Sequence, residues 1–110
     1  MKRLIAIVLV LSVSSYSHAG YNANFVGKIT KVLTYPYSNE VLIRVEGQPT
    51  SHPTCTSLDY LSIAPDVTDA ARQVVISRIL MAYASGEAIN IGYDKEGDCV
   101  SGRIRIHRVG

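Results

Sequence analysis

Two tyrosines flank a proline in the segment Tyr35-Pro36-Tyr37, which continues into Ser38 and Asn39. An exposed tyrosine ring offers an apolar face to the C–H side of a sugar and a hydroxyl to its polar edge. Two rings around a proline at a strand end cannot both point into a core, and Ser38 and Asn39 can add hydrogen bonds. The pattern predicts a glycan-binding patch of Tyr35, Tyr37, Ser38 and Asn39. The alternative is that the rings pack on the rim of the domain while the proline sets the turn.

Cys55 and Cys99 are the two cysteines of the chain. In an oxidising compartment an even pair predicts a disulfide, which would close a loop of about 45 residues and contribute roughly 4 kcal/mol. The alternative is a metal site made by His52, Cys55, Cys99 and His107, but this spacing matches no zinc pattern. We therefore expect a disulfide, with no metal ion and no cofactor.

The residues that catalysis requires are not arranged for it. Ser51 and His52 are adjacent, but an acyl-transfer site needs a nucleophile, a base and an acid that converge in space. The nine acidic residues are scattered over turns and strand ends, whereas glycoside hydrolysis needs two facing carboxylates. The chain has no glycine-rich phosphate loop. We expect a protein that is not an enzyme.

One short stretch near the end of the chain is basic, with Arg103, Arg105, His107 and Arg108. Such a face could hold a sulfate, a sialic-acid carboxylate or a phospholipid. The interpretation that we favour is a solvated face whose charge is balanced by nearby aspartates and glutamates.

The first residues of the 110-residue chain have the pattern of a targeting segment, which we expect to lie outside the folded domain. Lys2 and Arg3 precede an apolar run over residues 4–11, and Ser17-His18-Ala19 presents small residues two positions apart. This pattern predicts a secretory signal peptide over residues 1–19, cleaved near Ala19. The apolar run is too short to cross about 30 Å of hydrocarbon. The product, a single domain over residues 20–110 with no membrane span, would be secreted or periplasmic.

Charge argues against one class of partner. Removing Lys2 and Arg3 from the eleven basic residues leaves nine, equal to the nine acidic residues. A neutral domain has no field that attracts a polyanion, so we expect no binding of nucleic acid.

The order of elements predicts a β-rich α+β fold. Hydrophobic alternation and turn residues predict strands over residues 25–35, 40–46, 55–63, 87–93 and 100–109. A helix is expected over residues 68–85, capped by Asp66 or Thr68 and terminated by Gly86. Five strands with a helix between the third and fourth indicate an OB-fold-like barrel. That barrel would place strands three and five side by side and bring Cys55 to Cys99, whereas the alternative is an open α+β sheet.

The expected helix has more apolar surface than one core can cover. One stripe consists of Ala71, Val74, Val75, Ile79 and Ala82. On another side, Ile76, Leu80 and Tyr83 follow helical spacing where a monomer should be polar. This second side predicts an interface of a homo-oligomer. The alternatives are a covering loop, such as residues 47–53, or plain exposure. Arg78 lies within the first stripe and would extend to solvent or pair with an acid across an interface.

The stretch Tyr83-Ala84-Ser85-Gly86, followed at once by Glu87-Ala88-Ile89-Asn90-Ile91, resembles a known family. Gly27-Lys28-Ile29 and a cysteine at Cys55, followed by Ser62-Ile63 and Pro65, extend the likeness. The pattern is similar to the pentameric binding subunits of bacterial A–B toxins of the subtilase-cytotoxin and typhoid-toxin type.

This resemblance implies an OB-fold protomer that assembles into a ring, with a pentamer suspected, and binds cell-surface glycans. The chain departs from the family where only residues 20–24 precede the first strand, and where the second strand has no cysteine. The expected function is a secreted, oligomeric, non-enzymatic binding module for glycans or a partner protein. The alternative is a monomeric periplasmic interaction protein, of inhibitor or immunity type, that binds no glycan.

Overall fold

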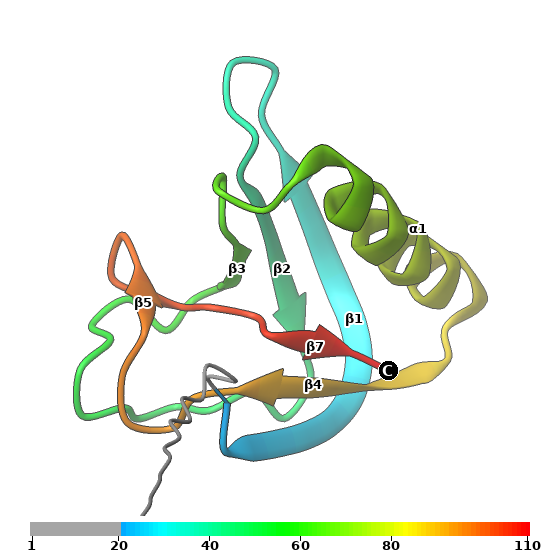
Figure 1. Ribbon diagram of the computed structural model, residues 1–110. Coiled ribbons are helices and arrows are strands. Elements are labelled where there is room, and N and C mark those ends of the chain that lie inside the picture. Colours follow the sequence, from blue (N-terminus) through cyan, green and yellow to red (C-terminus); the bar gives the residue numbers. More distant parts are fainter. Residues whose placement is uncertain (1–20) are drawn as a thin grey trace, which may run out of the picture.

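The long strand β1 (Ala23–Thr34) is the element that the two halves of the sheet share. It pairs antiparallel with β2 (Val41–Val45) through its second half and with β4 (Ala88–Tyr93) through its first half. The computed structural model describes residues 21–110, and Figure 1 shows β1 bending so that its lower part follows β4 and its upper part follows β2.

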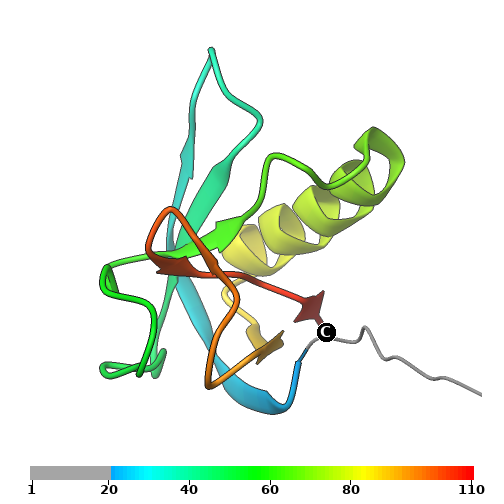
Figure 2. The same ribbon diagram turned by 60° about the vertical axis from the view of Figure 1, so that its left-hand side comes forward.

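Two further strands extend the sheet. β3 (Leu61–Ile63) pairs with β2, and β7 (Arg108–Val109) pairs with β4, which gives the order β3-β2-β1-β4-β7. The helix α1 (Asp69–Ser85) connects β3 to β4 and packs against β1, as Figure 2 shows from a second direction. A separate two-stranded sheet is formed by β5 (Cys99–Val100) and β6 (Arg103–Ile104).

The predicted β-rich fold with one helix is confirmed over residues 21–110, but the predicted closed barrel is wrong. The five strands form an open antiparallel sheet. A parallel bridge between Ser62 and Arg105 links the β3 edge to the segment before β7, and the Ile106 N–H donates to the Ser62 carbonyl at 2.9 Å. This link is too short to form the continuous ladder that barrel closure requires.

Two predicted strands differ from the observed ones. The third is extended only over Leu61–Ile63, because the preceding residues 46–60 run as a loop that contains Pro49 and Pro53. The fifth is divided, because Ser101 (φ 50°) and Gly102 (φ 86°) adopt left-handed backbone and turn the chain between β5 and β6.

The predicted disulfide between Cys55 and Cys99 is confirmed, with Cα atoms 5.5 Å apart. Cys99 begins β5, but Cys55 lies in the loop, so its predicted place at the start of a strand is wrong. The bond therefore fastens a long irregular loop to the small two-stranded sheet.

Local signals define both ends of α1. The Thr68 hydroxyl accepts a hydrogen bond from the Ala71 N–H at 3.4 Å, which caps the first turn. Gly86 ends the helix with φ 74°, a left-handed conformation that glycine adopts without strain. The helix begins at Asp69, one residue later than expected.

The core lies between the inner face of the sheet and α1. Val41, Ile43 and Val45 are buried on β2 as expected, but Leu42 on the other face is buried as well, so the alternation of burial is only partial. The helix contributes Ile79 and Ala82, and β4 contributes Ile89 and Ile91.

The predicted signal peptide lies outside the described residues. Among residues 21–110, no helix has the length and apolar character that crossing a membrane requires.

The close crossing of β1 and β2 depends on Gly27. A Cβ atom at this position would overlap the carbonyl oxygen of Glu46, a backbone atom that cannot rotate away. The Glu46 N–H also donates to the Lys28 carbonyl at 2.9 Å, which fixes that backbone in place.

We expect Gly27→Ala to destabilise the fold by about 2–4 kcal/mol, because the sheet must open to admit the methyl group. Denaturant unfolding of this variant and of Gly97→Ala measures the effect. Gly97 is the matched control, since nothing lies within 4 Å of its added Cβ. Equal unfolding midpoints for the two variants would show that the crossing tolerates a side chain.

Candidate functional site

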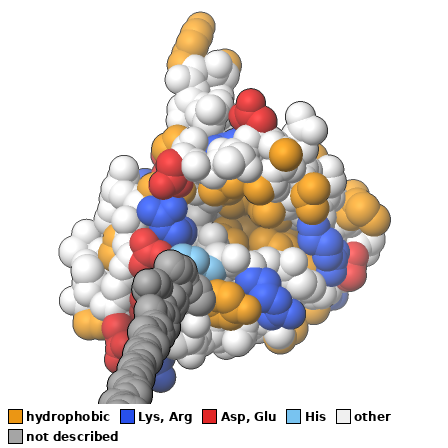
Figure 3. Space-filling model, in the orientation of Figure 1, with side chains coloured by type: hydrophobic (Ala, Val, Ile, Leu, Met, Phe, Trp, Pro, Cys, Tyr) orange, Lys and Arg blue, Asp and Glu red, His pale blue; other side chains and the backbone are white. Residues whose placement is uncertain are grey.

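The hairpin between β1 and β2 carries the predicted tyrosine patch at its tip and projects from the body of the molecule (Figure 1). Tyr37 is 99% exposed and Tyr35 is 43% exposed. The Ser38 N–H donates to the Tyr35 carbonyl at 3.4 Å and closes the turn. We call residues 35–40 the tyrosine hairpin, and Figure 3 shows hydrophobic side chains at its far end.

A shallow hollow of about 310 Å³ lies on the tyrosine hairpin, lined by Tyr35, Pro36, Tyr37, Ser38 and Glu40. The Ser38 hydroxyl accepts from the Glu40 N–H at 3.0 Å, so its own proton remains available to a ligand. Glu40, which the sequence prediction omitted, accepts from the buried Ser62 hydroxyl at 2.8 Å. That bond joins the hairpin to β3.

Arg72 of α1 holds the base of the tyrosine hairpin. Its guanidinium donates to the carbonyl oxygens of Asn39, Ala64 (2.9 Å) and Val67 (3.1 Å). No acid among residues 21–110 forms an ion pair with Arg72, and its Nε is buried without a partner. A partly buried cation bound by carbonyls alone is costly, so this clamp fixes the direction of the hairpin at the expense of stability. Asn39 contributes its main-chain carbonyl to the clamp.

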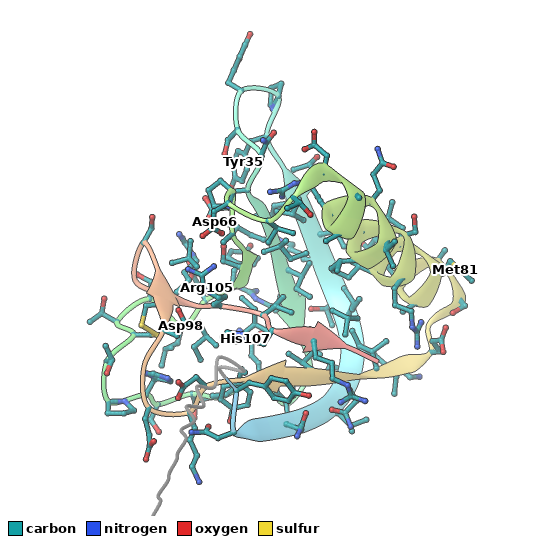
Figure 4. The ribbon with its side chains drawn as sticks, viewed as in Figure 1. Tyr35, Asp66, Met81, Asp98, Arg105 and His107 are labelled. Atoms are coloured by element: carbon teal, nitrogen blue, oxygen red, sulfur yellow. A yellow bond between two sulfur atoms is a disulfide. The ribbon has the colours of Figure 1, made fainter. Side chains whose placement is uncertain are left out.

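A second polar region, which we call the polar strip, consists of Asp59, Asp66, Asp98, Arg103, Arg105 and His107. Figure 4 shows Asp66, Arg105, Asp98 and His107 following one another below Tyr35. Its aspartates come from the loop before β3, the loop before α1 and the turn before β5, whereas its cations come from β6 and the segment after it.

Arg105 and Asp98 are the centre of the polar strip. Arg105 donates from Nε to Asp98 at 2.9 Å and from Nη1 to Asp66 at 3.2 Å. The second oxygen of Asp98 lies 2.5 Å from His107 Nε2. Burial opposes the charge of Arg105, but its bonds to Asp98 and Asp66 outweigh burial and raise its pKa.

Arg103 and Asp59 form a two-point pair at the other end of the strip, with distances of 3.1 and 3.4 Å. The hydrogen bond from Arg103 lowers the pKa of Asp59 below its ordinary value, and the bond to Asp59 raises the pKa of Arg103. The negative charge of Glu40 also contributes to the raised pKa of Arg103.

Three of the four basic residues in this stretch are balanced by acids, as our favoured interpretation holds, whereas Arg108 donates only to the Asn24 side-chain oxygen at 3.4 Å. Arg103, Arg105 and His107 all face aspartates. Sequence reasoning missed the identity of these acids because Asp59 lies 44 residues from Arg103. The available signal was an aspartate on either side of β3, at Asp59 and Asp66.

His52 lies beside the disulfide, and its ring nitrogens are already bonded. Nδ1 accepts from the N–H groups of Thr54 (3.1 Å) and Cys55 (2.9 Å), which leaves the proton on Nε2 to donate to the Asp94 carbonyl at 2.9 Å. The structure does bring His52, Cys55 and Cys99 within 4.8 Å of one another. Both sulfurs are in the disulfide, however, and the ring is in the wrong tautomer to offer Nε2 to a metal. His52 acts as a clamp on the loop.

The helix α1 is apolar on several sides. Leu80 and Tyr83 are 48% and 46% exposed, and no loop within residues 21–110 covers them. Ile76, which we expected beside them on the surface, packs partly against the core instead. Val74 was expected to face the core, but it is 71% exposed, and Met81 (Figure 4) is 65% exposed. Ile76 is therefore only partly available to the predicted interface. Val74 and Met81 add an exposed apolar surface on the outer side of the helix.

A hollow of about 190 Å³ lies on the opposite flank of the helix, between α1 and β7. Figure 3 shows it as a recess with hydrophobic side chains. Its apolar lining is Ile63, Val67, Ala71, Val75, Ile106 and Val109. Arg78 pairs with Glu87 of the same chain at 3.1 Å, and not with an acid across an interface.

Comparison with known proteins adds no constraint to this picture. No protein-family model, curated protein or solved structure matches the chain. The function must be argued from the tyrosine hairpin, the polar strip and the apolar faces of α1.

We expect Asp59→Asn to reduce the fall in the free energy of unfolding that occurs as the pH is lowered. Because the pKa of Asp59 lies below its ordinary 3.8, the ionised carboxylate stabilises the folded chain above that pH. This contribution disappears as the pH falls through the lowered pKa. Since the side chain of Asp59 is 47% exposed, the loss at neutral pH should not exceed about 1 kcal/mol.

Urea unfolding at several pH values between about 2 and 7 measures this effect. Glu46→Gln is the control, because exposed Glu46 forms no ion pair with residues 21–110. The assignment is wrong if the two variants show the same dependence of stability on pH.

Proposed function

We propose that this chain is an exported, non-enzymatic binding module whose tyrosine hairpin contacts a cell-surface glycan. The observation that carries the proposal is the 99% exposure of Tyr37 at the end of a projecting turn. Transfer of an aromatic ring out of water lowers the free energy, so a ring held fully in solvent is suited to binding a partner that covers it.

The groups around the rings fit a sugar. A sugar presents an apolar C–H face, which stacks on an aromatic ring, and hydroxyl groups that both donate and accept. The Ser38 hydroxyl can donate, and the carboxylate of Glu40 can accept. The clamp by Arg72 supports this function because a turn that is already fixed loses less conformational entropy on binding.

A protein partner is the second candidate, and the shape of the hairpin favours it. A narrow projection with a tyrosine at its end can enter a cleft, and tyrosine is enriched among residues that dominate protein interfaces. This interpretation corresponds to the monomeric inhibitor or immunity-type protein that binds no glycan.

The fold and the destination of the chain belong to the same proposal. The sharing of β1, the helix between β3 and β4, and the parallel bridge from Ser62 to Arg105 support an OB-fold-like arrangement. The Cys55–Cys99 disulfide supports passage through an oxidising compartment, which agrees with a signal peptide over residues 1–19.

Self-association through α1 would give such a module several binding sites. Leu80 and Tyr83 form an exposed ridge on one flank of the helix, and the hollow lined by Val75 and Val109 lies on the other. Two different apolar surfaces on one protomer suit a head-to-tail contact, which forms a ring when the rotation between neighbouring protomers closes. A ring of the pentameric kind, like the binding subunits that the sequence resembles, would convert weak single sites into avidity.

We expect Tyr37→Ala and Tyr35→Ala to lower glycan binding at least about tenfold, because each removes a stacking surface. A glycan array probed with the mature protein and these variants measures this. Tyr37→Phe should retain part of the binding, since it keeps the ring. Val26→Ala, at a 62% exposed position on β1 outside both the tyrosine hairpin and the helix surface, is the control.

Unchanged binding in both alanine variants would exclude the tyrosine hairpin as the glycan contact. If the unmodified protein binds no glycan at all, the glycan proposal fails and the protein partner becomes the better candidate.

We expect the mature protein to sediment as a multimer, with a mass of about 50 kDa for five chains against about 10 kDa for one. The double variant Leu80→Glu/Tyr83→Glu should be monomeric, because charge on the ridge prevents its burial. Analytical ultracentrifugation measures both masses. Val26→Glu places a charge at a 62% exposed strand position and should leave the mass unchanged. A monomeric unmodified protein would refute the ring.

A further inference from the structure

The paired strands β1 and β2 carry two neighbouring cations that no acid neutralises. Lys31 and Arg44 are directly opposite each other in the register of the two strands, and both are exposed. Like charges in opposed positions destabilise an antiparallel pair. Among residues 21–110 neither forms an ion pair, which also holds for Lys28, Arg72, Lys95 and Arg108; what sets Lys31 and Arg44 apart is that they are opposed in the register.

A β-bulge in β1 produces this arrangement. The register shifts between Ile29 and Lys31, so Thr30 is the extra residue. Ile29 is buried, but Thr30 and Lys31 are both exposed, whereas a regular strand would turn Lys31 back to the face of Ile29. The bulge therefore places Lys31 on the surface that Arg44 occupies, and bulges commonly redirect side chains in this way beside functional sites.

Arg44 is held in position without an acid. Its Nε donates to the Asp59 carbonyl at 3.1 Å, and its guanidinium carbon lies 4.7 Å from the centre of the Tyr60 ring. These contacts orient the side chain but occupy one of its five N–H groups, so both Nη groups remain available. The Thr30 hydroxyl donates to the Arg44 carbonyl at 3.3 Å, which fixes the bulge against β2.

Arg44 also borders a groove of about 480 Å³, whose polar lining includes Thr30, Glu46, Gln48, Thr50 and Asp59. The Gln48 amide and the Asp59 carboxylate are engaged within the chain, so the Thr50 hydroxyl and the Glu46 carboxylate are the polar groups that face a ligand. The carboxylate of Glu46 would repel a polyanion such as nucleic acid, but it accepts hydrogen bonds from hydroxyl groups. The groove therefore suits a polar ligand that carries only one negative group.

We propose that Lys31 and Arg44 form a site for a single oxyanion, a carboxylate or a sulfate, carried by a hydroxyl-bearing molecule that occupies the adjacent groove. The bound group would neutralise the opposed cations and accept hydrogen bonds from the free Nη groups of Arg44. This site shares no residue with the tyrosine hairpin, so it stands or falls independently of the function proposed above.

The test is an NMR titration of ¹⁵N-labelled mature protein at low ionic strength with sodium sulfate, with glucuronate and with uncharged glucose. Sulfate or glucuronate should move the resonances of Thr30, Lys31 and the Arg44 side chain in a saturable way, and glucose should not. A response to sulfate alone or to glucuronate alone assigns the preferred oxyanion. Arg44→Gln and Lys31→Gln should each weaken binding about tenfold. Lys95→Gln removes an equal charge from an exposed turn and should change affinity less than about twofold.

A second measurement protects the test from misfolded variants. Because Lys31→Gln removes the opposed charge, it should raise the unfolding midpoint at low salt, and added sulfate should raise that of the unmodified protein more. The proposal is overturned if Lys95→Gln weakens binding as much as Arg44→Gln, if the shifts are spread over the surface, or if glucose shifts the same resonances as glucuronate.

Discussion

The pairing of β1 with both β2 and β4 is the constraint on which the rest of the structure depends. One strand can serve both partners only if it changes direction, and Gly27 permits this because the Glu46 carbonyl passes where a side chain would otherwise lie. The end of β1 then leads into the tyrosine hairpin, and the bulge at Thr30 lies between these two points. Both candidate binding surfaces therefore follow from the course of a single strand.

The arginines of this domain divide by what satisfies their charge. Arg103 and Arg105 face aspartates, so the polar strip is nearly neutral and its charged groups are occupied by ion pairs within the chain. Arg72 is satisfied by carbonyls and fixes a turn. Arg44 is oriented by a carbonyl and a ring, with its outer donors unused. This last arrangement leaves both Nη groups free for an outside group, whereas the sequence alone makes Arg103 and Arg105 look like the basic site.

The sequence predicts what neighbours in the chain determine. Thr68 and Gly86 bound α1 by short-range hydrogen bonds and backbone conformation, and the alternation in β2 reports its buried face. The tyrosine hairpin was predictable for the same reason, because its residues are consecutive. The open form of the sheet was not predictable in this way. It depends on the pairing between the β3 edge and the segment before β7, which is limited to the bridge between Ser62 and Arg105. The redirection of Lys31 by a bulge likewise leaves no local trace, and the acid partner of Arg103 lies 44 residues away in the sequence.

Because β1 belongs to both halves of the sheet, neither half can unfold independently of the other. Opening β1 from β4 would expose Ile89 and Ile91, and opening it from β2 would expose Ile43 and Val45. Neither half retains a complete core without the other, so partial unfolding gains little entropy for a large loss of burial. We therefore expect the domain to unfold in one cooperative step, and the amide protons at the middle of β1 to exchange with solvent only when the whole domain unfolds.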